Sequence, residues 1–434
     1  MTSKIVVNNI EADSGVSTVT FNSNVERGTS NLHSVGLEAA GINVLGADTP
    51  IGTGSTIYDD GGARFSGIVT ATAFHGDGSS LTGVGASFGN SSINTSGIIT
   101  ATAFIPTVGQ LSHRNKVING GMIVHQRGDA SATGSAAYLS CDRFKTNNGC
   151  GAQVAVTKST DTPDGFGAST KWDCTTADTS VAASDFFLIQ HRLEGQNIQD
   201  FAKGTSSAKQ FALSFYIKAT KTGVYTVELE DVDNNRHCSK TITVSDTNWN
   251  RYKIIYPADT TGAFVNDNNF SLSINFWLLG GSNYTSGTLQ SSSWGTGATT
   301  RCSSSNVNAM DSTSNDFYLT GVQLEVGDTV TSFEHRSYGD ELLRCQRYFI
   351  SGKAAIGSAY NGWGGSQVQG VYLTFPVIMR SDPTITFPTN HSSSNVVNAD
   401  YTYHVSSTGF SYRVNLSGNG NYHRQSTYHA SSEL

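Results

Sequence analysis

The sequence predicts an all-β protein made of an intertwined N-terminal β shaft, a central jelly-roll β-sandwich, one short linker helix and a small C-terminal β domain. Charged residues make up only 14% of the 434 residues, against about 25% in an average soluble protein. Their place is taken by Gly, Ser, Thr, Asn, Tyr and Phe. Ser and Asn disfavour helix interiors, whereas Thr, Tyr and Phe fit a pleated sheet. A duplicated strand-like segment and regularly spaced turn clusters support the same fold class.

The duplicated segment defines the shaft. Ser66–Phe74 recurs with one residue changed at Ser96–Phe104, and each copy is a Ser-Gly turn followed by β-branched residues at period two. Two copies cannot bury a core of their own. We therefore expect neighbouring chains to complete the sheets, with a homotrimer as the preferred solution and a hairpin array within one chain as the alternative. Residues 1–65 are assigned to an anchoring segment and 66–112 to the shaft.

Residues 113–335 carry alternating apolar and polar segments of ordinary globular type, which indicate a β-sandwich of jelly-roll type. The predicted strands are Val117–Val124, Gln210–Lys218, Gly223–Glu230, Thr241–Ser245, Trp249–Tyr256, Ser271–Leu279 and Asp316–Glu325.

A linker helix is predicted within residues 336–349. Ser337 and Asp340 resemble a capping box, Glu341 lies in the first turn and Arg344 in the last, an order that suits the helix dipole. Residues 350–434 then form the C-terminal domain, with strands at Gln367–Pro376, Thr384–Phe387, Tyr401–Val405, Phe410–Leu416 and near Tyr428. A core this small gains from oligomerisation.

Several function classes are disfavoured by composition. The net charge of −7 and the lack of any basic block argue against nucleic-acid binding. No window of 18 apolar residues predicts membrane insertion. The N-terminus lacks the apolar region of a signal peptide, so we expect synthesis in a cytoplasm. The six cysteines have no CxxC spacing, and free buried thiols are favoured over three disulfides.

Catalytic and metal-binding signals are weak. The acidic cluster from Glu228 to Asp233 could serve a polysaccharide depolymerase, which needs two carboxylates, but a solvated strand face is the favoured interpretation, and we predict no enzymatic activity. A structural Ca²⁺ held by Asp142 and Glu325 is a second possibility, against which we favour salt bridges from these acids to arginines. No cofactor is predicted.

Sugar binding needs flat aromatic faces flanked by polar groups. Trp363 stands in a Gly-rich loop after Tyr360, and Tyr422 with His423 stands in another. Trp294 lies in a Ser/Gly-rich segment. These five residues are the predicted glycan-binding positions.

The sequence resembles the tail-fibre proteins of tailed bacteriophages, particularly those of marine cyanobacteria. The resemblance covers most of the chain apart from Gln153–Lys171 and residues 388–425, and it rests on these segments: Ser66–Phe74, Gly76–Gly83, Ser96–Phe104, Arg114–Gly121, His125–Gly128, Asp142–Phe144, Phe317–Gly327, Phe333–Ser337, Leu343–Phe349, Phe375–Arg380 and Ser431–Leu434.

The resemblance implies a virion component whose N-terminal part attaches to other tail proteins and whose C-terminal half binds a host. We therefore predict a trimeric tail fibre that attaches to a host-surface polysaccharide or lipopolysaccharide. The alternatives are a purely structural capsid or connector fibre and a depolymerase.

Overall fold

The computed structural model describes residues 49–50, 55–57, 62–66, 68, 112–134, 136–360, 367–397 and 400–434, in two compact units that divide after Thr100. In the first unit three short antiparallel strands pair in the order β1-β2-β3, namely Thr49–Pro50, Ser55–Ile57 and Ala63–Phe65. The duplicated segment of the predicted shaft lies almost wholly outside the described residues, and the predicted anchor is described only at these strands.

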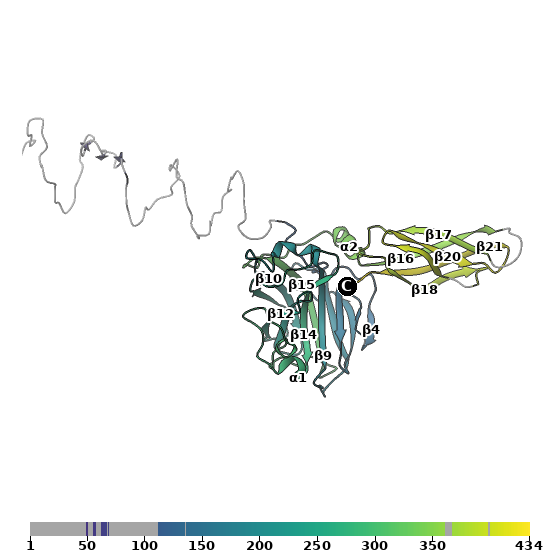
Figure 1. Cartoon of the computed structure of the whole chain (residues 1–434), viewed down its shortest axis with the longest axis horizontal. Coiled ribbons are helices and arrows are strands. Elements are labelled where there is room, and N and C mark those ends of the chain that lie inside the picture. Colours follow the sequence, from purple (N-terminus) through teal and green to yellow (C-terminus); the bar gives the residue numbers. More distant parts are fainter. Residues whose placement is uncertain are drawn as a thin grey trace, which may run out of the picture. The chain divides into compact units, whose positions relative to one another are not determined.

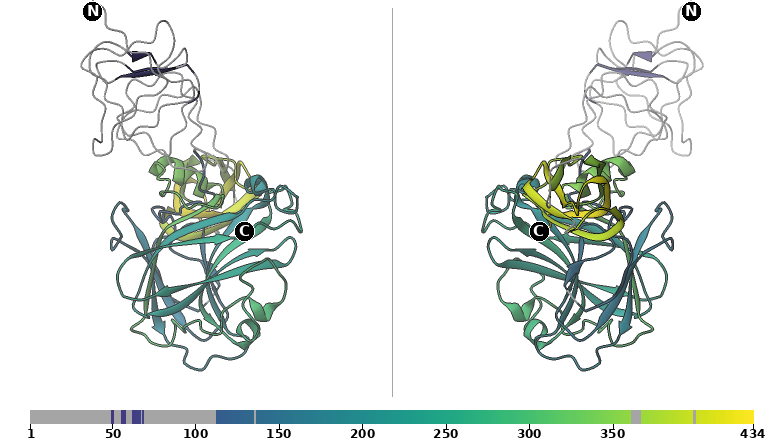
Figure 2. Two further views of the ribbon diagram at one scale, coloured as in Figure 1. Left: turned by 90° about the vertical axis from the view of Figure 1, so that its left-hand side faces the viewer. Right: turned by 90° about the vertical axis from the view of Figure 1, so that its right-hand side faces the viewer.

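The larger unit begins with a sandwich of two six-stranded antiparallel sheets, which face each other in Figure 2. One sheet has the order β13-β10-β15-β8-β7-β4 and the other β12-β11-β14-β9-β6-β5. The strands are β4 Ala130–Thr133, β5 Ala137–Tyr138, β6 Phe144–Asn148, β7 Gln153–Ser159, β8 Ser169–Thr176, β9 Phe186–Glu194, β10 Phe211–Ala219, β11 Gly223–Asp231, β12 Arg236–Val244, β13 Asn250–Tyr256, β14 Phe270–Gly280 and β15 Asp316–Val326. Short helices lie between them, at Gly195–Asn197, Gln199–Phe201, Ser282–Thr285 (α1) and Ala298–Thr300.

The core lies between the two sheets and is built by period-two alternation. On β11, Tyr225, Val227 and Leu229 face inward and are almost fully buried, while the residues between them face outward. Phe215 of β10 meets Phe276 of β14 edge to face across the core, with ring centroids 5.0 Å apart. Each such buried apolar side chain contributes about 1.5–3 kcal/mol, and this burial stabilises the sandwich.

The strand predictions from Gln210 to Glu325 are confirmed, with Thr241–Ser245 forming only the end of the longer β12. The prediction of a strand at Val117–Val124 is wrong. Asn119 accepts hydrogen bonds from the backbone N–H groups of Ile123 and Val124 and donates back to the carbonyl of Val124. An Asn side chain can thus satisfy backbone groups that a strand would have paired, and the segment turns instead. Strands β4 to β9 were not predicted.

The predicted helix is present as α2, Tyr338–Gln346. Ser337 caps it by accepting a hydrogen bond from the backbone N–H of Asp340 at 3.2 Å. Glu341 is buried and accepts a hydrogen bond from the Asn119 backbone at 2.5 Å, so the helix is bound to the first loop of the sandwich.

The C-terminal domain consists of two facing three-stranded antiparallel sheets (Figure 1). Sheet β16-β21-β18 comprises Phe349–Tyr360, Gly420–Ser431 and Thr384–Ser394, and sheet β17-β20-β19 comprises Val368–Thr374, Gly409–Asn415 and Tyr401–Ser406. Phe410, Tyr412 and Val414 of β20 form the centre of a separate small core. All five predicted strands are present here, and β16 is an addition.

The last residues of the chain bind the sandwich. Glu433 pairs with Arg127 at 2.9 Å and with Arg143, whose side chain is completely buried. Arg143 also stacks on Tyr348, with its guanidinium carbon 3.5 Å from the ring centroid. The C-terminal domain is therefore joined to the sandwich by buried charge pairs. All six cysteines are free, and five are buried, in agreement with the prediction of free thiols.

Candidate functional site

The acidic pair on β11 is not a solvated face, so that interpretation is wrong. Glu228 is completely buried and accepts hydrogen bonds from Trp277 Nε1 at 3.0 Å, Arg301 Nε at 2.7 Å and Asn275 Nδ2 at 2.9 Å. Arg301 also pairs with Glu230 at 2.7 Å. Burial raises the pKa of Glu228, and Arg301 opposes this shift. The segment that carries Arg301 thus covers this face and engages both carboxylates.

We expect Arg301→Met to destabilise the sandwich by about 2 kcal/mol, because it leaves a buried carboxylate without its charged partner. Urea denaturation at pH 7 measures the effect. Lys253→Met, at an exposed position of β13, is the control and should change the free energy of unfolding by less than about 0.5 kcal/mol. Equal effects of the two changes would contradict the assignment of Arg301 as the main counter-charge.

Asp142 and Glu325 do not meet at a shared site. Asp142 pairs with Arg127 at 3.2 Å, and Glu325 lies 3.9 Å from Arg114 and accepts a hydrogen bond from the Thr331 backbone. The salt-bridge interpretation is therefore confirmed for both acids. Among the described residues no group of three or more His, Cys, Asp or Glu side chains is arranged to hold a metal ion. Within the same residues no helix has the length and apolarity to cross a membrane.

The predicted glycan-binding residues are dispersed. Trp363 lies outside the described residues. Trp294 is 5% exposed, donates from Nε1 to the carbonyl of Pro257 at 2.8 Å and packs in the sandwich core, so its ring is not available to a ligand in this conformation. Tyr422 is also buried, in the C-terminal core, against which the half-buried Tyr360 packs. His423 faces the other side of β21 and is exposed.

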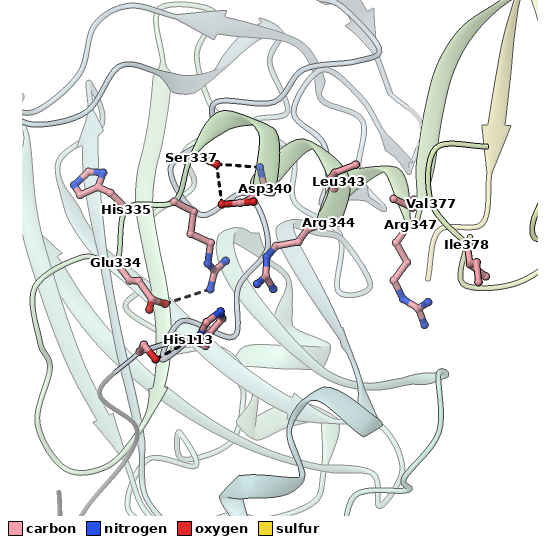
Figure 3. A pocket seen from close by; sticks show the side chains of 12 residues that line it. His113, Glu334, His335, Ser337, Asp340, Leu343, Arg344, Arg347, Val377 and Ile378 are labelled. Carbon is pink, nitrogen blue, oxygen red and sulfur yellow. Dashed lines mark hydrogen bonds and ion pairs between the residues drawn. The ribbon is translucent and has the colours of Figure 1, made fainter. Parts of the chain in front are cut away.

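A cleft of about 650 Å³ lies at the linker helix (Figure 3). Its lining includes His113, Arg336 and Arg344, with Leu343 and Ile378 at its edge. Arg336 pairs with Glu334 and Glu341, and Arg347 pairs with Glu194. None of the described residues that line the cleft is a Trp, Tyr or Phe. Its polar groups mostly bind one another, and the rings among its described lining residues are the imidazoles of His113 and His335.

A second surface has the properties that the cleft lacks. On the outer face of sheet β17-β20-β19, Ser411 of the central strand pairs with Tyr372 on one side and with Tyr403 on the other. Both tyrosines are about half exposed, at 49% and 48%. Arg413, two residues along the same strand, pairs with Gly370 and Tyr401. The pleat therefore gathers aromatic rings, a hydroxyl and a guanidinium on one face.

Gly370 makes the hollow in this face. A Cβ atom there would lie 3.0 Å from Cγ of Arg413 and 3.2 Å from the carbonyl oxygen of Tyr412. Without it, a groove of about 330 Å³ opens between Val368 and Tyr372, with Ser411 and Arg413 along its side. We name this surface, lined by Val368, Gly370, Val371, Tyr372, Ser411 and Arg413 and flanked by Tyr403, the tyrosine groove.

The side chains of the tyrosine groove are held in position. The guanidinium carbon of Arg413 lies 4.0 Å from the centroid of the Tyr403 ring, a cation–π contact. A break in the β19–β20 register follows Tyr403, and His404 there adopts a positive φ of 49° and packs edge-on against the Tyr403 ring. Such bulges redirect side chains. The sequence reasoning missed this site, although the alternation Val368, Gly370, Tyr372 and the pair Tyr401, Tyr403 were visible signals.

No family model matches the sequence. Among curated proteins, no relative is found. The structure is similar to part of tailspike protein 4 of bacteriophage CBA120, whose printed title describes an enzymatically active domain, with 15% identity and a TM-score of 0.25. That match covers 49% of this chain and 21% of the other, so this chain spans about a fifth of the tailspike's length.

Carbohydrate-binding modules are also similar. A CBM4 module matches with 11% identity and a TM-score of 0.27, over 48% of this chain and 99% of its own. A family 11 module of Clostridium thermocellum, in complex with a β-1,3-1,4-mixed-linked tetrasaccharide, matches with 14% identity and a TM-score of 0.23, over 48% of this chain and 98% of its own. TM-scores below 0.5 carry no functional argument for this chain.

Proposed function

We propose that this protein is a non-enzymatic, trimeric tail fibre of a tailed bacteriophage, located in the virion, which attaches to a host-surface glycan through the tyrosine groove of its C-terminal domain. The observation that carries the glycan-binding part is the placement of Tyr372 and Tyr403 on either side of Ser411 on one open sheet face. The resemblance of the sequence to tail-fibre proteins supports the virion part, with the N-terminal segment docking to other tail proteins.

The groove suits a sugar for physical reasons. A pyranose presents a flat C–H face to an aromatic ring and hydroxyl groups to polar partners. Tyr372 offers a ring face, and Tyr403, stacked with Arg413, offers the part of its ring that stays exposed. Ser411 and Arg413 offer a hydroxyl and N–H donors between them. A shallow groove supports modest affinity at each site, and three sites in a fibre with many fibres in a virion would raise the avidity by 10²-fold or more.

We expect Tyr372→Ala and Tyr403→Ala each to weaken glycan binding about fivefold, because each removes about 1 kcal/mol of ring contact. Binding of the purified protein to an array of bacterial surface polysaccharides measures this. Tyr338→Ala is the matched control, since Tyr338 lies on α2 away from the groove and is 57% exposed. If only Tyr338→Ala lost glycan binding, the binding site would lie outside the tyrosine groove.

The same polysaccharide array distinguishes the glycan-binding fibre from a purely structural fibre and from a depolymerase. Absence of binding to every polysaccharide would favour a purely structural fibre, and release of oligosaccharide from a bound polymer would favour a depolymerase. Sedimentation tests the trimer: a species of 46.1 kDa, the mass of one chain, would contradict it.

A further inference from the structure

Arg413 differs from most of the arginines in the described part of the chain. Within the described residues from 112 onward, every arginine except Arg344 and Arg413 makes an ion pair or donates a hydrogen bond to another residue. Arg424 on the neighbouring strand, for example, pairs with Asp400. Among the described residues Arg413 has no ion pair or hydrogen-bond acceptor, and its guanidinium contacts the Tyr403 ring, which fixes it but uses none of its N–H donors.

The charge of Arg413 is also uncompensated on its own sheet face. The outward residues of the three strands that pair around it are Val368, Gly370, Tyr372, Tyr401, Tyr403, Ser411 and Asn415, none of which is acidic. Tyr401 donates its hydroxyl to Asn415 at 3.0 Å, so that these two neighbours satisfy each other. A cation therefore stands at the side of an aromatic groove with its donors unused.

We infer that the glycan bound in the tyrosine groove carries a carboxylate, as uronic and related acidic sugars do, and that this carboxylate binds Arg413. This inference rests on the proposed function. A guanidinium presents its N–H donors in a flat fork that matches the two oxygens of a carboxylate, and charge-assisted bonds of this kind are stronger than neutral ones. A neutral sugar hydroxyl would leave most of the fork unused.

Gly370 supports this assignment, because it leaves room beside the stem of Arg413. Any side chain there would press on Cγ of Arg413 and fill the groove from its floor. The site therefore combines a space for a sugar ring with a fixed cation at the edge of that space.

The test uses the full chain and an array of bacterial surface polysaccharides, each in its native form and in a form whose carboxyl groups have been reduced to alcohols. We expect at least one acidic polymer to bind about tenfold or more tightly in its native form than after reduction. Arg413→Gln should abolish that difference, and Arg413→Lys should restore only part of it, since lysine keeps the charge but not the fork. Arg344→Gln is the matched control, because Arg344 is the other unpaired arginine, and it should leave the difference intact.

The outcomes separate the two proposals. Equal binding of native and reduced polymers, lost in Tyr372→Ala, would overturn the acidic-sugar inference and leave glycan binding by the groove standing. Binding that follows sulfated or phosphorylated polymers irrespective of carboxyl reduction would also overturn it. Binding to no polymer would count against both. Gly370→Val, which fills the groove while keeping Arg413, should abolish binding, and unchanged binding in that variant would contradict the site itself.

Discussion

Glu433→Gln is expected to destabilise the junction between the C-terminal domain and the sandwich by about 3–5 kcal/mol. Arg143 is completely buried, and Glu433 is its acidic partner. Removing one partner of a buried ion pair leaves an uncompensated charge away from water, which costs far more than the pair contributes. The contact of Arg143 with the carbonyl of Arg192 at 2.7 Å remains but carries only a partial charge.

Denaturant unfolding followed by Trp fluorescence, together with limited proteolysis of the C-terminal domain, measures the effect of Glu433→Gln. Asp382→Asn is the control, because Asp382 is exposed in the same domain and should change stability by less than about 0.5 kcal/mol. If the two variants unfold at the same denaturant concentration and resist protease equally, the buried charge pairs do not hold the junction together.

Acid is expected to destabilise the sandwich well above the pH at which carboxylates are usually protonated. Burial lowers the pKa of His125 to about 4 and that of His237 to about 4, and it lowers the pKa of His191 well below 6.5. The unfolded chain takes up protons on these residues near pH 6.5, whereas the folded protein does not. Their contribution to stability is therefore complete above pH 6.5 and is lost as the pH falls towards 4.

Buried carboxyls oppose this loss. Burial raises the pKa of Asp142 to about 6, so the folded protein takes up a proton there before the unfolded chain does. Burial likewise raises the pKa of Glu228. The pKa values of Asp231 and Asp316 are raised by burial as well. Because the three histidines have the larger effect between pH 7 and pH 5, we expect the free energy of unfolding to fall over that interval.

Urea denaturation at pH 7 and at pH 5 measures the slope, which is the change in the free energy of unfolding between the two pH values. The variant His125→Gln removes the contribution of one histidine to that slope. This variant should lose about 2 kcal/mol less than the parent protein over that interval, whatever its stability at pH 7. His391→Gln, at an exposed position of β18, should keep the parent slope. Identical slopes in all three proteins would show that His125 is not held neutral by the fold.

The sequence determined the class of the fold and the positions of about half of its described strands and of the helix α2. Alternation of apolar and polar residues located β10, β11, β14 and β15, since one face of each must enter a core, and the Ser337 cap located α2. The same alternation located the strands of the C-terminal domain. Where local side chains competed with the backbone, as at Asn119, the pattern predicted a strand that is not there.

Only the tertiary structure decided what lies over the outward face of each strand. Period-two alternation says that Glu228 and Glu230 share a face, and that Val368, Gly370 and Tyr372 share another, but it does not say which face is covered. Arg301, more than seventy residues from Glu228, buries the first face, whereas no described segment fills the groove beside Arg413. Cover and exposure depend on contacts between distant parts of the chain, and local pattern does not encode them.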